Sequence, residues 1–260
     1  MIVNKTRILV TGATGGIGAA LCRQLSAAGA LLVMTCQDRD KLKQLQQELG
    51  EEHMVVSADV GTEEGRRKIA DSCEQFAVTG VINLAGIMNF GMFADQPNAT
   101  VEKMLQINTV APILLTRTLL PQLMLQPRAR IVNVGSIFGS IGHPGFAVYC
   151  ASKAAIRTFS EALSRELADT GVSVAYIAPR ATRTALNPDR VVAMNKALGN
   201  KSDTPELVAS TIIGLFESSD NQCFMGWPEK FFVKLNALLP GLVRQSLVKN
   251  LSLIRQYAQQ

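Results

Sequence analysis

Arg7-Ile-Leu-Val-Thr11-Gly12-Ala-Thr14-Gly15-Gly16-Ile17-Gly18-Ala-Ala-Leu21 is the stretch that decides the fold. Its apolar, β-branched beginning predicts a buried strand, its glycines predict a tight loop, and the residues from Ala19 onward have helical spacing. Glycines let the backbone approach a ligand closely, and the N-terminus of a helix offers free N–H groups to an anion. The stretch therefore predicts a phosphate-binding loop, and a plain glycine-rich turn between strand and helix is the alternative.

The same alternation of strand and helix continues along the chain. Apolar runs predict further strands at 29–35, 54–58, 81–86, 130–134 and 172–177, and helical patterns predict helices at 40–49, 62–76, 99–125, 149–167 and 204–217. Strands that alternate with helices favour an α/β fold with a single Rossmann-like, doubly wound parallel sheet and helices on both faces. We expect one domain over residues 1–260, ending in an amphipathic helical extension from about residue 227.

Composition narrows the class of protein. The chain has 260 residues and a net charge of +5 from scattered Lys and Arg, which indicates weak affinity for phosphates rather than nucleic-acid binding. The five cysteines are far apart and there are two histidines, so we expect neither a disulfide framework nor a metal site. We also expect no signal peptide, no bilayer-spanning segment and a reducing, cytoplasmic compartment.

A candidate catalytic group follows the strand at 130–134. Tyr149 and Lys153 are four residues apart, so they share one face of a helix. A Lys cation beside a phenol lowers the pKa of the phenol, which would let Tyr149 transfer a proton near neutral pH. Ser136, at the end of the strand, is placed to polarise a substrate oxygen. Alternatively, the pair is an ordinary aromatic residue and a solvated charge.

Pro112 interrupts the helix predicted at 99–125. Because Pro112 has no N–H, the carbonyl of Asn108, four residues earlier, loses its helical partner and is free to bind water. The alternative is a kink that serves packing alone. We favour the functional interpretation, because Asn and Pro inside an apolar helix cost stability.

The ends of the second and third strands carry the next candidates. The second ends without an acid at its tip, and Asp38 there is best interpreted as the N-cap of the following helix. Arg39 either reaches a 2′-phosphate or is a surface charge. Asp59 either accepts a hydrogen bond from an adenine amino group or begins a helix cap, for which Thr62 is another candidate.

The C-terminal third is harder to interpret. Arg180, after the strand at 172–177, either recognises an anionic substrate or points to solvent. The weak periodicity of residues 186–202 predicts a mobile, partly helical segment over the site. The amphipathic tail either covers the core or a partner subunit, lines an apolar substrate pocket, or touches a membrane surface. Other candidates for an apolar pocket, which are equally ordinary core residues, are Phe90, Met92, Phe93, Phe138 and Phe146.

Six motifs in order over residues 7–184 together resemble the short-chain dehydrogenase/reductase family. They are Thr11-Gly12-x-x-x-Gly16-x-Gly18, Asp59-Val60, Asn83-Leu-Ala-Gly86, Asn108, Ser136 and Tyr149-x-x-x-Lys153. The resemblance implies an NAD(P)-dependent oxidoreductase with Tyr149 as the acid/base, Lys153 as its partner and ribose ligand, Ser136 orienting the substrate and Asn108 holding a relay water. The residues that it implies contact the cofactor are Thr11, Gly12, Thr14, Gly15, Gly16, Ile17, Gly18, Gln37, Arg39, Asp59, Val60, Asn83, Ala85, Gly86, Tyr149, Lys153, Pro179, Thr182 and Thr184.

The chain departs from the family pattern at three places. Leu84 replaces a second Asn, and Arg180 follows Pro179 where the family usually has Gly. The missing acid after the second strand removes a repulsion against a 2′-phosphate, so we favour NADP(H) over NAD(H). The family also implies a homodimer or homotetramer.

The function expected from these residues is reversible hydride transfer between a nicotinamide and a carbonyl or secondary alcohol of a small, apolar substrate. Two alternatives stay open. One is a non-catalytic dinucleotide-binding scaffold or interaction protein. The other is a reductase of lipid-like substrates at a membrane surface, with contact through the tail; we do not favour membrane contact.

Overall fold

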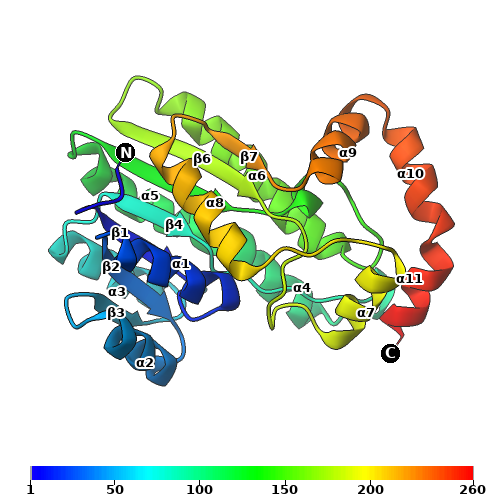
Figure 1. The fold of residues 1–260 in the computed structure, drawn as a ribbon, viewed down its shortest axis with the longest axis horizontal. Coiled ribbons are helices and arrows are strands. Elements are labelled where there is room, and N and C mark those ends of the chain that lie inside the picture. The colour runs from blue at the N-terminus through cyan, green and yellow to red at the C-terminus, as the bar shows by residue number, and fades with distance from the viewer. Residues whose placement is uncertain (1, 260) are drawn as a thin grey trace.

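A parallel sheet forms the centre of the computed structural model, which describes residues 2–259 (Figure 1). Its seven strands lie in the order β3-β2-β1-β4-β5-β6-β7, and all neighbouring pairs are parallel. The strands are β1 Arg7–Thr11, β2 Leu31–Cys36, β3 Met54–Ser57, β4 Gly80–Asn83, β5 Ala129–Val134, β6 Val172–Ala178 and β7 Gln222–Phe224. The predicted doubly wound α/β fold is confirmed. The short edge strand β7 was not predicted.

Helices cover both faces of the sheet and continue beyond it. They are α1 Gly16–Ala27, α2 Arg39–Leu49, α3 Glu63–Gln75, α4 Asn98–Leu105, α5 Ala111–Met124, α6 Ala147–Glu166, α7 Asp189–Ala197, α8 Pro205–Glu217, α9 Trp227–Leu238, α10 Pro240–Lys249 and α11 Leu251–Ala258. One core cluster joins the sheet to α1, α2 and α8, and a second joins it to α3, α5 and α6. Alternate residues of the buried strands feed these two cores, which is why the strands are apolar on both faces.

The helix predicted at 99–125 is three segments rather than one. A π-helical turn, Gln106–Val110, separates α4 from α5, and Pro112 lies in the first turn of α5. A π-helical turn accommodates one residue more than an α-helical turn, so some backbone groups lose their usual α-helical hydrogen-bond partners. The interruption predicted from Pro112 is therefore present, one turn before the proline.

The last three helices form an arm, residues 227–258, that stands away from the sheet (Figure 1). The arm leaves the sheet after β7, turns between α9 and α10, and returns to α7 through α11. Ile254 of α11 is fully buried in a cluster with Val191 and Met194 of α7. Asn236 of α9 donates to the Ser140 carbonyl at 2.9 Å, which ties the other end of the arm to the loop after β5.

Candidate active site

The glycine loop between β1 and α1 is built so that side chains are excluded. A Cβ on Gly16 would lie 2.6 Å from Thr184 Cγ2, and one on Gly18 would lie 2.1 Å from the Gly12 carbonyl oxygen. The loop ends at Gly15, which caps α1 without a side-chain hydrogen bond, so the first amides of the helix lack intrahelical partners. These amides and the bare backbone fit the phosphates of a dinucleotide.

The side chains of the two threonines in this stretch, Thr11 and Thr14, form hydrogen bonds to other parts of the protein. Thr11 Oγ1 accepts hydrogen bonds from the backbone N–H groups of Leu84 and Ala85, both at 3.0 Å, and so ties β1 to the end of β4. Thr14 Oγ1 donates to Cys36 Sγ at 3.0 Å and ties the loop to the end of β2. Both hydroxyls therefore shape the loop.

Positive charge lies at the end of β2. Asp38 is the N-cap of α2, as predicted: its carboxylate accepts from the Lys41 N–H at 3.0 Å and pairs with the Lys41 ammonium at 3.1 Å. Gln37 and Arg39 on either side are exposed. Asp38 is thus occupied by a helix cap and a lysine, while Asp40 lies exposed in the first turn of α2.

Asp59 and Asn83 are held by protein contacts. Thr62 is the N-cap of α3, and Asp59 Oδ1 accepts from the Gly61 N–H at 2.7 Å. Asn83 is buried and donates to Thr116 Oγ1 at 3.1 Å and Asn133 Oδ1 at 2.8 Å. Its side chain therefore lies in the core between the sheet and α5, away from the cavity described below. Of the predicted cofactor residues at this strand end, Gly86 lines that cavity, whereas Asn83 lies within β4 with its side chain bonded in the core.

Ser136, Tyr149 and Lys153 meet at the ends of β4 and β5. Ser136 follows β5 and its Oγ accepts from the Phe138 N–H at 3.1 Å. Tyr149 is in the first turn of α6, and Lys153, one turn later, lies with Nζ 5.8 Å from the centre of the Tyr149 ring. Lys153 Nζ donates to the Val134 carbonyl at 3.2 Å. The shared helix face predicted from the spacing is confirmed.

The electrostatics of this group differ from the sequence-based expectation. Burial raises the pKa of Tyr149 above its usual value, and a hydrogen bond with the Ser136 side chain opposes that shift. Burial also lowers the pKa of Lys153 to about 8, because the low-dielectric interior disfavours the ammonium. The net shift of the Tyr149 pKa is therefore upward, the reverse of the lowering expected from Lys153, because desolvation is the larger effect.

Asn108 lies in the π-helical turn beside this group. Its side chain is buried and completely engaged: Oδ1 accepts from the Ile87 N–H at 2.8 Å, and Nδ2 donates to the Ile87 carbonyl at 2.8 Å and to Ser152 Oγ at 3.1 Å. These bonds hold the loop after β4 against α6. A Cβ on Gly86 would lie 3.2 Å from Asn108 Oδ1 and 3.4 Å from Lys153 Nζ, so glycine lets that loop pass close to both side chains without displacing them.

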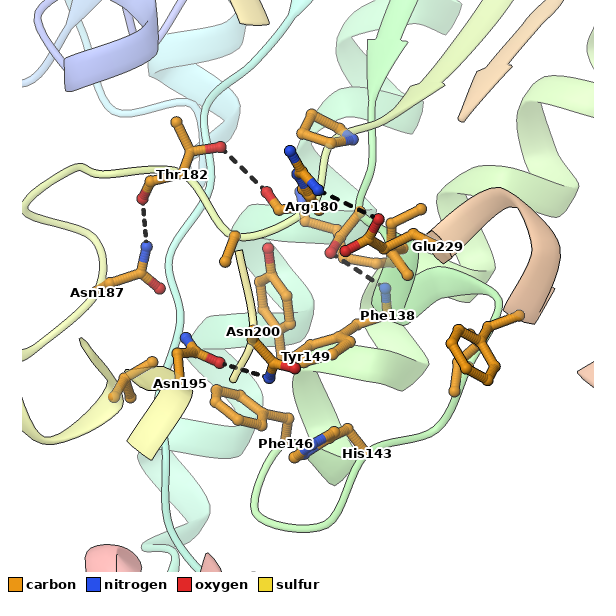
Figure 2. Close-up of a pocket in the computed structure, with 18 of the residues that line it drawn as sticks. Phe138, His143, Phe146, Tyr149, Arg180, Thr182, Asn187, Asn195, Asn200 and Glu229 are labelled. Carbon is orange, nitrogen blue, oxygen red and sulfur yellow. Dashed lines mark hydrogen bonds and ion pairs between the residues drawn. The ribbon is translucent and has the colours of Figure 1, made fainter. Parts of the chain in front are cut away.

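Arg180 borders the cavity described below and pairs with carboxylates of the protein rather than facing solvent. Its guanidinium donates to Asp203 Oδ1 through Nε at 2.9 Å and Nη2 at 2.6 Å, and it pairs with Glu229 of α9 at 3.4 Å (Figure 2). Asp203 is only 5% exposed. The solvent-facing alternative for Arg180 is therefore wrong, because the side chain pairs with two carboxylates that lie far along the chain. The residue joins the loop after β6 to the arm.

One cavity of about 620 Å³ connects these elements. Its polar end contains Ser136, Tyr149 and Lys153, and Pro179, Thr182 and Thr184 border it. Thr182 Oγ1 donates to the Arg180 carbonyl, and the Thr182 carbonyl accepts from Asn187 (Figure 2). Predicted residues from four different strand ends thus lie around a single space.

Aromatic side chains surround Tyr149 in this cavity. Phe138 stacks on His143 with ring centres 5.0 Å apart, and Phe146 contacts both rings (Figure 2). Of the predicted pocket residues, Phe138 and Phe146 line the cavity, whereas Phe90 is buried behind Phe146 and Phe93 is exposed. His143 was not predicted as a pocket residue. Because His143 lies only six residues before Tyr149 in the sequence, it could have been predicted to lie near that residue.

The arm supplies the wall opposite the sheet, in agreement with the pocket-lining reading of the tail. Among the arm residues that line the cavity are Phe232, Leu235, Leu242, Val243, Leu247 and Ile254. No helix within residues 2–259 is both long and apolar enough to cross a lipid bilayer. Within the same residues, no group of three or more His, Cys, Asp and Glu is placed to hold a metal.

Comparisons with known proteins agree with this geometry. A sequence model described as short chain dehydrogenase matches residues 6–194. Nodulation protein G of Rhizobium sp. (strain N33) is 34% identical over 182 residues, which cover 69% of this chain and 74% of that protein. The 3-oxoacyl-[acyl-carrier-protein] reductase FabG of Rickettsia bellii (strain RML369-C) is 31% identical over 171 residues, covering 66% of this chain and 70% of the relative.

A solved structure extends the similarity. The closed form of serine dehydrogenase complexed with NADP⁺ superposes with a TM-score of 0.78 and 26% identity, and covers 85% of this chain and 94% of that one. The chain belongs to the short-chain dehydrogenase family, as the motifs predicted. It is an NAD(P)-dependent oxidoreductase that acts on CH–OH or C=O groups.

Proposed function

We propose that the protein reduces a carbonyl, or oxidises a secondary alcohol, with Tyr149 as the acid/base and NADP(H) as the preferred cofactor. The observation that carries the proposal is the convergence of Ser136, Tyr149 and Lys153 at the polar end of one cavity beside the glycine loop. When bound, the dinucleotide supplies or accepts a hydride at its nicotinamide ring. The protein supplies the proton and the polar side chains that surround the reacting carbonyl.

In the reducing direction, Tyr149 donates its phenolic proton to the carbonyl oxygen. The raised pKa of Tyr149 keeps the phenol protonated before the reaction, and Ser136, which hydrogen-bonds to it, also donates toward the developing oxyanion. Lys153 lies beside the Tyr149 ring, where its ammonium stabilises the phenolate that remains. The Asn108 carbonyl, which Pro112 leaves without its helical partner, holds the water that returns a proton through Lys153.

The preference for NADP(H) is supported by the charge at the end of β2. Asp38 is occupied by Lys41, and Arg39 is exposed beside it, so at this strand end a 2′-phosphate meets a cation next to a carboxylate that is already paired. The serine dehydrogenase of similar fold binds NADP⁺.

Replacing Tyr149 tests the assignment. Tyr149→Phe removes the transferable proton and should lower kcat for a reducible ketone at least about a hundredfold, while the Kd for NADPH stays within about twofold of the wild-type value. The matched control is Tyr257→Phe, because Tyr257 lies on α11 and is not among the residues that line the cavity. Wild-type turnover in Tyr149→Phe would remove Tyr149 from the proposed role.

A further inference from the structure

The cavity has two chemically different ends. Titratable groups gather where β4, β5 and β6 end, and mostly apolar side chains, interspersed with the uncharged polar Asn195, Ser246 and Asn250, gather where α7 faces the arm. Resting on the function proposed above, we infer that the substrate is a linear aliphatic ketone or secondary alcohol. Its oxygen reaches Tyr149 and its hydrocarbon chain lies between α7 and the arm.

The shape of the arm wall favours an extended chain. On α10 and α11 the lining residues Val243, Leu247, Asn250 and Ile254 recur at intervals of three or four residues, so they form a stripe along one face. From Val243 to Asn250 this stripe is about 10 Å long at 1.5 Å per residue. Apart from Asn250 the stripe is apolar, and its length gives each added methylene of a linear chain new surface, which a compact ring would not use.

The charges of the arm favour an uncharged chain. Lys230, Lys234, Arg244 and Lys249 of the arm are absent from the cavity lining. Of the charged groups in that lining, Arg180 and Glu229 are paired with each other and Arg180 with Asp203. Lys153 belongs to the catalytic group, and Lys201 lies exposed on the loop after α7. The apolar part of the cavity within residues 2–259 thus offers an acidic or cationic tail no buried partner.

The size of the cavity leaves room for this chain. Ile17, Gly86 and Thr184 border the portion next to the glycine loop, where the nicotinamide end of the cofactor is expected. The total of about 620 Å³ lies within the range of about 300–1,000 Å³ that is usual for pockets that bury a ligand of drug size. The remaining space extends to the arm, and Figure 2 shows its aromatic floor at Phe138 and Phe146 beside Tyr149.

A series of unbranched methyl ketones, from 2-butanone to 2-dodecanone, tests the inference with the full chain and NADPH. We expect kcat/KM to rise about fourfold per methylene, which corresponds to about 0.8 kcal/mol, until the stripe is covered. Leu235→Asn should reduce this slope, because Leu235 lines the cavity. Leu238→Asn is the matched control on the same helix and should leave the slope unchanged, because Leu238 is 79% exposed and outside the lining. Leu247→Ala, on α10, provides a second test if Leu235→Asn fails to fold.

Binding separates this inference from the proposed function. Calorimetric titration of the same ketones into Tyr149→Phe with NADPH present measures the chain-length dependence of Kd without turnover, and it should show the same gradient. Turnover of short ketones with a flat series in both measurements would overturn the inference and leave the function. Graded binding without turnover of any ketone by the wild-type chain would support the pocket and overturn the function. Equal slopes in Leu235→Asn and Leu238→Asn would also overturn the inference.

Discussion

Lys153 shows how one side chain serves both structure and chemistry. Its Nζ is held by the Val134 carbonyl and lies beside the Tyr149 ring, in an interior that lowers its pKa to about 8. Burying an ammonium costs free energy, which a purely structural position would avoid with an apolar residue. The role proposed for Lys153, in which its ammonium stabilises a transient phenolate at Tyr149, accounts for this cost. A pKa that burial shifts this far from its usual value is typical of catalytic residues.

This burial predicts a pH dependence of stability. The folded pKa of Lys153, about 8, is below its usual unfolded value of about 10.4, so between these values the unfolded chain binds more protons and stability rises with pH. Relative to Lys153→Met, the free energy of unfolding of the wild-type chain should increase by about 1–2 kcal/mol from pH 8 to pH 9.5. Urea unfolding without added dinucleotide measures it. Parallel curves for the two chains would show that Lys153 keeps an ordinary pKa in the fold.

At the scale of elements, Arg180 joins three segments that are distant in the sequence. It follows β6, pairs with Asp203 before α8 and reaches Glu229 in the first turn of α9. The loop from Thr182 to Asp203 is further held by the backbone bond from Arg183 N–H to the Asp203 carbonyl, at 3.0 Å. The position of the arm over the cavity therefore depends on an ion pair near the end of β6 as well as on apolar packing.

Removing this cation should weaken the fold. Arg180→Met leaves the Asp203 carboxylate buried without its partner, and we expect a loss of about 2–3 kcal/mol in the free energy of unfolding. Asp203→Asn in the same chain should recover part of that loss, since the neutral amide tolerates burial better. Urea unfolding of the two single variants and the double variant measures the coupling. Additive losses would show that the pair contributes little.

At the scale of the molecule, the sheet and the helical character of the arm were predictable, whereas the position of the arm over the cavity was not. Apolar runs and glycine loops identify strands whose carboxyl ends must meet, so Tyr149, Ser136 and the glycine loop could be brought together from the sequence. The strand β7 was not predicted, because a pattern of three residues is too short to indicate a strand. The spacing of Leu235 and Leu238 indicates a helix, but it does not say which neighbour covers it. The partners of Arg180 lie 23 and 49 residues away, beyond any local pattern.

Dinucleotide binding should stabilise the whole molecule in a way that reports cofactor choice. At about a hundredfold excess over Kd, NADP⁺ adds about 2.7 kcal/mol, which corresponds to a rise in Tm of roughly 5–10 °C for a chain of this size. Arg39→Gln should reduce the rise at a fixed NADP⁺ concentration by roughly 2–4 °C, for a loss of about 1 kcal/mol, and leave the effect of NAD⁺ unchanged. Thermal scans measure both. Equal shifts for the two dinucleotides in both chains would contradict the preference for NADP(H).

The single tryptophan of the chain lies where the arm begins and serves as an intrinsic fluorescent probe. Trp227 is the first residue of α9, is 77% exposed, and is the only tryptophan of the chain. Its fluorescence therefore originates at the joint between the sheet and the arm, with no label and no competing indole. A shift of the emission maximum during a titration would locate the change at that joint, and the sheet would remain spectrally silent.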